Sequence, residues 1–129
     1  MSIKEFTTEV EENIKNVLCI DFDGVIHDHY LGFHDGTIYG KPLKGALDSI
    51  KYLAKTYRII IYTCKANPNR PLINGKTGIE LIWEWLEKYK ANQYVEEITY
   101  TKPNAIAYID DKAIRFENWS QTMNIIGQL

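Results

Sequence analysis

The sequence predicts one α/β domain that spans all 129 residues and contains a mainly parallel β-sheet. Apolar runs of strand length alternate along the chain with segments in which apolar residues recur at helical spacing, which is the pattern of βαβ units. A chain of this length buries one core and is too short for two. With 45% apolar residues, the chain can offset the entropy lost on ordering. We therefore expect helices on both faces of the sheet, in three α/β/α layers.

The first half of the chain predicts two helices and two strands. A capping-box pattern at Thr8 and Glu11 indicates a short helix near the N-terminus. The apolar runs at 17–20 and 58–63 indicate buried strands. Pro42 suits the first turn of the helix between them, because its missing N–H is not needed there. The apolar face of this helix consists of Leu43, Leu47, Ile50, Leu53, Ala54 and Tyr57.

The second half predicts two helices and two further strands. Thr77 and Glu80 form another capping box after a loop rich in Pro, Gly and Asn. The helix that they open carries Ile79, Ile82, Leu86 and Tyr89 on one face. Residues 97–100 give a weak strand pattern and residues 105–109 a strong one. Residues 117–126 predict a last helix, in which Trp119, Met123 and Ile126 are expected to have a structural role.

Composition and charge limit the cellular setting and the partners. The N-terminus lacks the basic start and apolar core of a signal peptide, and no apolar run reaches membrane-spanning length, so we expect a cytoplasmic protein without a membrane partner. Cys19 and Cys64 fit a reducing compartment and are expected in the core. The net charge of -2 gives no general attraction to polyanions, so nucleic acid is not favoured as a partner, although a local basic patch stays open.

A glycine-containing segment at about 25–41 predicts a short β-hairpin flap beside the ligand-binding edge of the sheet. The segment is too short to form a separate cap domain. Its histidines, His27, His29 and His34, are candidate zinc ligands, but nothing in their spacing fixes a coordination geometry, and polar flap residues explain them more simply. Substrate-facing roles for His27 and Tyr30 stay open.

Polar side chains stand where three of the predicted strands end. Asp21 and Asp23 follow the first strand, Thr63 ends the second, and Asp110 and Asp111 follow the last. Because parallel strands deliver their carboxyl ends to one edge of the sheet, these residues are expected to converge there. Several carboxylates in a small space repel one another unless a cation neutralises them. Mg²⁺ is the cofactor expected, since it takes oxygen ligands and commonly shares its shell with phosphate.

These residues resemble the motifs of the haloacid dehalogenase-like hydrolases, and the likeness extends from Val17 to Asp111. The resemblance implies a Rossmann-like domain of the capless phosphatase branch, in which Asp21 is the nucleophile and forms an aspartyl-phosphate. Asp23 would be the general acid and base, and its backbone carbonyl would bind the metal. Asp21 and Asp110 would bind Mg²⁺ directly, with Asp111 in an outer or water-mediated contact.

The resemblance also implies a set of phosphate-binding groups. Thr63 and the backbone amides of Cys64 and Lys65 would hold the phosphoryl oxygens. Lys102 matches the lysine motif of the family, yet only eight positions separate it from Asp110, which is too few for a helical crossover. Lys102 therefore reaches the site from an irregular connection, or else Lys65 or Lys112 supplies the positive charge.

The function expected is Mg²⁺-dependent hydrolysis of a small phosphomonoester. One alternative is an end phosphatase for nucleotides or nucleic acid, which salt-dependent polynucleotide binding would reveal. Another is a non-catalytic phosphate-sensing or scaffold module of the receiver type, which would accept phosphate on an aspartate other than Asp21. A homo-oligomer that closes the site also stays open.

Overall fold

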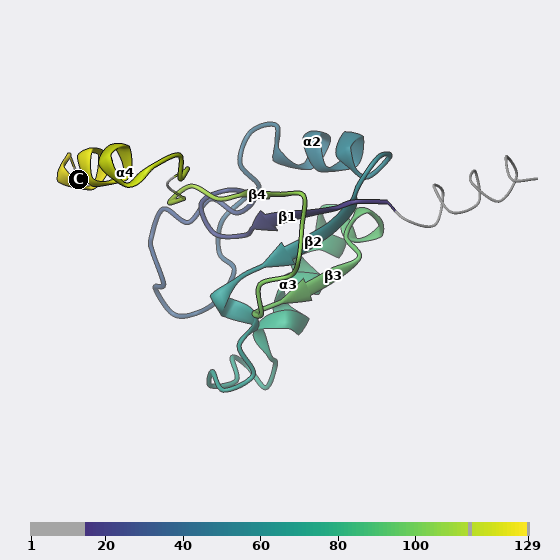
Figure 1. Cartoon of the computed structure of the whole chain (residues 1–129). Coiled ribbons are helices and arrows are strands. Elements are labelled where there is room, and N and C mark those ends of the chain that lie inside the picture. The colour runs from purple at the N-terminus through teal and green to yellow at the C-terminus, as the bar shows by residue number, and fades with distance from the viewer. Residues whose placement is uncertain (1–14, 114, 129) are drawn as a thin grey trace, which may run out of the picture.

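A computed structural model describes residues 15–113 and 115–128, and the helix predicted at Thr8 and Glu11 lies outside these residues. Four parallel strands form one sheet in the order β3-β2-β1-β4 (Figure 1). The strands are β1 (Val17–Asp21), β2 (Arg58–Tyr62), β3 (Glu97–Thr99) and β4 (Ala107–Ile109). Each begins and ends within two residues of the predicted bounds. The α/β class and the parallel sheet are therefore confirmed.

The central position of β1 brings the ends of three strands together. Asp21 pairs with Tyr62 of β2, so that Thr63 follows beside it, and Ile20 pairs with Ile109 of β4, so that Asp110 follows on the other side. In an open parallel sheet, ligands bind at the carboxyl edge. The register alone thus places the predicted site residues of β1, β2 and β4 at one edge.

Three α-helices are described: α2 (Ala46–Leu53), α3 (Gly78–Lys88) and α4 (Trp119–Gly127), together with the short 3-10 helices η1 (Cys64–Ala66) and η2 (Asn92–Tyr94). Helix α2 begins later than the prediction from Pro42, because Gly45 precedes it with a left-handed backbone (φ 81°) that cannot continue a right-handed helix. The capping box of α3 is confirmed. Glu80 donates its N–H to the Thr77 hydroxyl at 3.2 Å, and the Glu80 carboxylate accepts from the Thr77 N–H at 3.3 Å.

One apolar core joins the sheet to α2 and α3. It contains alternate residues of β1 and β2 together with buried residues of both helices: Leu18, Ile20, Ile59, Ile61, Ile50, Ile82, Trp85 and Leu86. Cys19 and Ile60 alternate to the opposite face, where the segment 100–106 crosses the strands (Figure 1). No helix among the described residues covers that face. The described chain therefore forms two of the three predicted layers.

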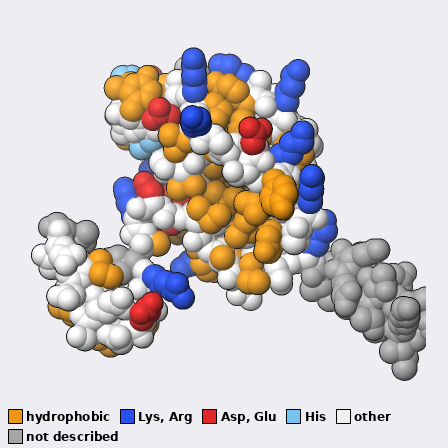
Figure 2. Space-filling view, turned by 90° about the horizontal axis from the view of Figure 1, so that it is seen from above, with side chains coloured by type: hydrophobic (Ala, Val, Ile, Leu, Met, Phe, Trp, Pro, Cys, Tyr) orange, Lys and Arg blue, Asp and Glu red, His pale blue; other side chains and the backbone are white. Residues whose placement is uncertain are grey.

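The C-terminal helix lies apart from this core. Figure 2 shows α4 and the segment before it as a lobe beside the main body of the molecule. Trp119 and Met123 are 69% and 60% exposed, and Ile126 is 44% exposed. The helical spacing of these three residues predicts the helix that is observed. Their predicted structural role is not supported, because the described residues do not bury their side chains. No described helix is both long and apolar enough to cross a membrane.

The predicted β-hairpin flap is wrong. Within the described chain, residues 25–41 form successive turns with isolated bridges from His27 to Asp23 and Pro42. Gly32 and Gly36 have positive φ angles, which bend the segment where a strand would have to run straight. The Tyr39 hydroxyl donates to the Gly32 carbonyl at 2.7 Å and accepts from the Leu31 N–H at 2.9 Å. A side chain thus supplies hydrogen bonds that a hairpin ladder would have made.

The prediction for the two cysteines is half right. Cys19 of β1 is buried, whereas Cys64 is exposed. The chain turns out of the sheet after Thr63 to form η1, and this turn carries Cys64 away from the core.

We expect Thr77→Ala to lower the free energy of unfolding by about 1 kcal/mol, because the substitution removes the side-chain acceptor of the α3 capping box. Urea unfolding followed by circular dichroism measures this difference. Thr56→Ala is the matched control, since Thr56 is exposed in a loop. An equal loss in the two variants would show that the capping box does not stabilise α3.

Candidate active site

A cleft of about 540 Å³ opens at the carboxyl edge of the sheet. The residues after β1, β2 and β4 and the loop 25–41 together line it. The lining residues are Asp21, Asp23, Gly24, Asp28, His29, Tyr30, Leu43, Thr63, Cys64, Asp111 and Lys112. Convergence of the strand ends thus brings most of the predicted site residues into one cavity.

Three carboxylates form the acidic side of this cleft. Oxygen atoms of Asp21, Asp110 and Asp111 all lie within 4.8 Å of one another. Gly24 makes this approach possible, because a Cβ atom there would collide with the Asp111 carboxylate, and its φ of 84° is a conformation that favours glycine. The Phe22 N–H donates to Asp21 Oδ1 at 2.8 Å and fixes the orientation of that side chain.

The carboxyl group of Asp21 holds its proton more tightly than a free aspartate does. Burial, together with the charges of Asp110, Asp111 and Asp23, raises the pKa of Asp21 from 3.8 to about 6, although its hydrogen bond from Phe22 acts in the opposite direction. Among the described residues, no lysine, arginine or histidine forms an ion pair with Asp21, Asp110 or Asp111. A divalent cation fits this set, because all the donors are hard oxygens and the charge is uncompensated.

Asp23 has a different environment only two residues further along. Its Oδ1 accepts from His27 Nδ1 at 2.8 Å and lies 3.3 Å from His29 Nδ1, and its Oδ2 lies 3.1 Å from Lys65 Nζ. Burial alone would raise the pKa of Asp23, but the hydrogen bond from His27 and the charge of Lys65 lower it below the ordinary value. The two aspartates therefore have pKa values shifted in opposite directions, because their neighbours differ.

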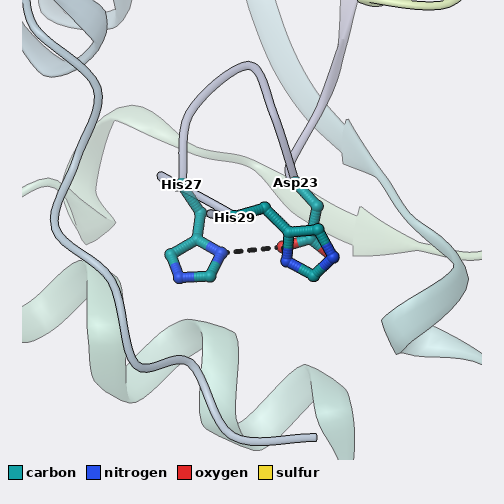
Figure 3. A group of neighbouring side chains, drawn as sticks. All are labelled: Asp23, His27 and His29. Atoms are coloured by element: carbon teal, nitrogen blue, oxygen red, sulfur yellow. Dashed lines mark hydrogen bonds and ion pairs between the residues drawn. The ribbon is translucent and has the colours of Figure 1, made fainter. Parts of the chain in front are cut away.

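Asp23, His27 and His29 form a second cluster whose ligand atoms lie within 4.8 Å of one another (Figure 3). The hydrogen bonds argue against a metal ion at this cluster. His27 Nε2 accepts the Gly40 N–H at 2.9 Å, so the proton of the imidazole is on Nδ1, the atom that faces Asp23. A protonated nitrogen cannot bind a metal, and the Lys65 ammonium already neutralises Asp23.

Thr63 and the residues after it form the floor of the cleft. Thr63 is buried, and its hydroxyl accepts the Lys65 N–H at 3.2 Å, which leaves the hydroxyl proton free to donate. The Lys65 amide, predicted to hold a phosphoryl oxygen, is thus already engaged. Cys64 lines the cleft directly. The Lys65 side chain is 6% exposed and points to Asp23.

Lys102 lies on the irregular connection between β3 and β4, which is one of the two arrangements left open by its spacing. It lines a separate cavity of about 280 Å³ together with Asp21 and Asp110, and its ammonium stands 4.4 Å from the centre of the Tyr108 ring. Lys112 lines the main cleft. Lys102 and Lys112 thus each share a cavity with carboxylates of the acidic group, whereas Lys65 pairs with Asp23.

Sequence reasoning missed Asp28, which lines the cleft beside His29. It also missed Gly40, whose N–H binds His27 Nε2. Gly40 comes 17 positions after Asp23, and no motif connects the two positions. His34 is exposed and takes no part in the cleft.

No protein-family model, curated protein or solved structure matches the chain.

We expect Asp21→Asn to raise the free energy of unfolding of the metal-free protein by about 1 kcal/mol at neutral pH. The raised pKa of Asp21 means that the folded protein holds this proton more tightly than the unfolded chain, so the stability it contributes below pH 3.8 is lost as the pH rises to about 6. Asparagine stays neutral and avoids the loss. Urea unfolding in EDTA at several pH values measures the difference.

The difference in free energy of unfolding between the wild type and Asp21→Asn should disappear as the pH is lowered from 6 towards 3.8, because the wild-type side chain is itself protonated there. Mg²⁺ should raise the melting temperature of the wild type more than that of Asp21→Asn. An equal Mg²⁺ effect on both would argue against Asp21 as part of the metal site.

Proposed function

We propose that this protein is a Mg²⁺-dependent phosphomonoester hydrolase of the haloacid dehalogenase type, with a Rossmann-like core and no cap domain. The observation that carries the proposal is the pairing of two differently held aspartates in one cleft. Asp21 lies among uncompensated carboxylates, whereas Asp23 is held by His27 and Lys65. A nucleophile beside a metal and a separate acid/base group are the parts that this two-step reaction needs.

Asp21, Asp110 and Asp111 would hold the Mg²⁺, with the backbone carbonyl of Asp23. When bound, the cation supplies positive charge that offsets the carboxylates and the phosphoryl oxygens. Thr63 lies on the neighbouring strand end, where its free hydroxyl proton can donate to a phosphoryl oxygen. Cys64 follows it in the lining of the same cleft.

In the first step, a carboxylate oxygen of Asp21 forms a bond to phosphorus while the bond from phosphorus to the leaving oxygen breaks. The leaving oxygen takes the proton of the Asp23 carboxyl group, so that an alcohol departs and an aspartyl-phosphate remains. Asp23 must therefore be protonated before this step. The negative charge of a bound phosphoryl group raises the pKa of a neighbouring carboxyl, which favours uptake of that proton with the substrate.

In the second step, the Asp23 carboxylate takes a proton from water, and the water oxygen forms a bond to phosphorus. The bond from phosphorus to Asp21 breaks, which releases inorganic phosphate and restores both aspartates to their starting states. The ionised Asp23 of the free protein is already in the form that this step requires. The loop 25–41 supplies one wall of the cleft through His29 and Tyr30.

We expect the protein to hydrolyse 4-nitrophenyl phosphate in Mg²⁺ and to lose this activity in EDTA. Asp21→Asn should reduce kcat by about 10³-fold or more, because it removes the attacking oxygen anion. Asp23→Asn should reduce it by about 10²- to 10⁴-fold, since it removes the acid/base. Release of nitrophenolate in steady state measures both. Asp48→Asn is the control, because Asp48 is exposed in the first turn of α2.

Trapping of the phosphorylated residue separates this function from the alternatives. Rapid acid quench with a labelled substrate, followed by peptide mapping, should place the phosphate on Asp21. A label on another aspartate, without turnover, would support a receiver-like sensing module. Turnover confined to nucleotide or polynucleotide ends, with strong salt dependence, would support the end phosphatase.

A further inference from the structure

A further cavity, of about 280 Å³, opens between the loop 25–41, the loop 67–77 and helix α3. No residue that lines it also lines the cleft. Its lining is mainly apolar and includes Phe33 and Ile38 of the first loop, Ile73 of the second and Leu81 of α3. We call it the apolar cavity.

Three of these side chains have no place in the core of the protein. Phe33, Ile73 and Leu81 come from three separate segments, and none of them belongs to the apolar core or packs against it. Leu81 also lies outside the apolar face predicted for α3. Single exposed apolar residues are common on protein surfaces, but a concave group of them is typical of a ligand site.

Local structure holds the walls of the apolar cavity in place. Ile73 and Lys76 exchange two backbone hydrogen bonds of 2.9 and 3.0 Å, which close the turn 73–76. A Cβ atom at Gly36 would come within 2.9 Å of the Ile73 side chain, and one at Gly78 would collide with a backbone carbonyl of η1. Two glycines thus allow the three segments to approach closely, and the cavity is formed before any ligand binds.

The charge of the apolar cavity is positive. Lys65 and Arg70 are the charged residues that line it, and the ammonium of Lys65 is already paired with Asp23. The Arg70 guanidinium stands 5.6 Å from the centre of the Phe33 ring, and no carboxylate of the described residues pairs with it. Both Arg70 and Phe33 are exposed, so one uncompensated positive charge lies at the mouth of the cavity.

We propose that the apolar cavity binds a small aromatic carboxylate, with its ring among Phe33, Ile38 and Leu81 and its carboxylate on Arg70. A cavity of about 150 Å³ is enough for benzene, so this one has room for two fused rings. The planar guanidinium can hold a carboxylate through two parallel hydrogen bonds. A carboxylate also brings one negative charge for one free cation, whereas a phosphomonoester brings nearly two. Binding here does not depend on hydrolysis in the cleft.

The test compares an anionic ligand with its neutral isostere. Naphthalene-2-carboxylate and naphthalene-2-carboxamide are titrated into the 129-residue chain, and assigned amide signals are followed in ¹H–¹⁵N spectra. The carboxylate should shift the signals of Gly36, Ile73 and Gly78 and leave those of Gly24 and Thr63 unchanged. We expect a Kd of about 1 mM or lower for the carboxylate. The carboxamide should bind about 10-fold more weakly, because it lacks the charge.

Two variants separate the charge from the cavity. Arg70→Gln should weaken the carboxylate by about 10-fold and leave the carboxamide unchanged, and its control is Arg115→Gln, since Arg115 is exposed and lines neither cavity. Leu81→Trp should fill the cavity and abolish binding of both ligands. Leu72→Trp is the matched control, because Leu72 is 60% exposed and does not line the cavity.

Four results would overturn the proposal. They are no shift in the wild type at about 10 mM carboxylate, equal affinity for the two ligands, unchanged carboxylate affinity in Arg70→Gln, and shifts confined to Gly24 and Thr63. The last result, reversed by inorganic phosphate, would place the ligand in the cleft. If Leu81→Trp does not fold, Arg70→Gln still decides the test, because Arg70 is exposed in a loop and its substitution leaves the core intact.

Discussion

The parallel pairing of β1 with β2 and β4 is the constraint on which the rest of the structure depends. It delivers Asp21, Thr63 and Asp110 to one edge although 89 positions separate the first from the last. Side chains brought together in this way include three carboxylates that repel one another unless a cation or a proton intervenes.

The environments of Asp21 and Asp23 differ because successive residues after a strand meet different neighbours. Asp21 faces the turn after β4, while Asp23 faces the loop 25–41 and Lys65. The pKa of one group is raised and that of the other is lowered without any change of residue type. The same difference favours a metal ion at the Asp21, Asp110 and Asp111 cluster over one at the Asp23, His27 and His29 cluster. The first cluster forms no ion pair with a described basic side chain, whereas in the second the proton of His27 is on Nδ1, the atom that would have to bind the ion.

The strands and α3 could be predicted because short-range patterns determine them: apolar runs of strand length, and a capping box at Thr77. The grouping of the aspartates followed from the geometry of parallel sheets. The loop 25–41 could not be predicted, because its conformation depends on the Tyr39 hydroxyl and on Gly40, which act over distances that no periodicity records. The exposed position of α4 was equally hidden, since helical spacing shows which face is apolar but not what that face packs against.

The loop 25–41 both lines the cleft and, through His27, holds Asp23, the proposed acid/base group, so that a change in one part of the loop affects the other. Substitutions that reshape the wall at Asp28 or Tyr30 act on the same short backbone that aligns His27 with Asp23. Under the proposed function, substrate preference and proton transfer are therefore coupled in this chain. A lineage that alters what the cleft admits must preserve the spacing between residues 27 and 40, so new specificities should arise by exchange of side chains at fixed loop length.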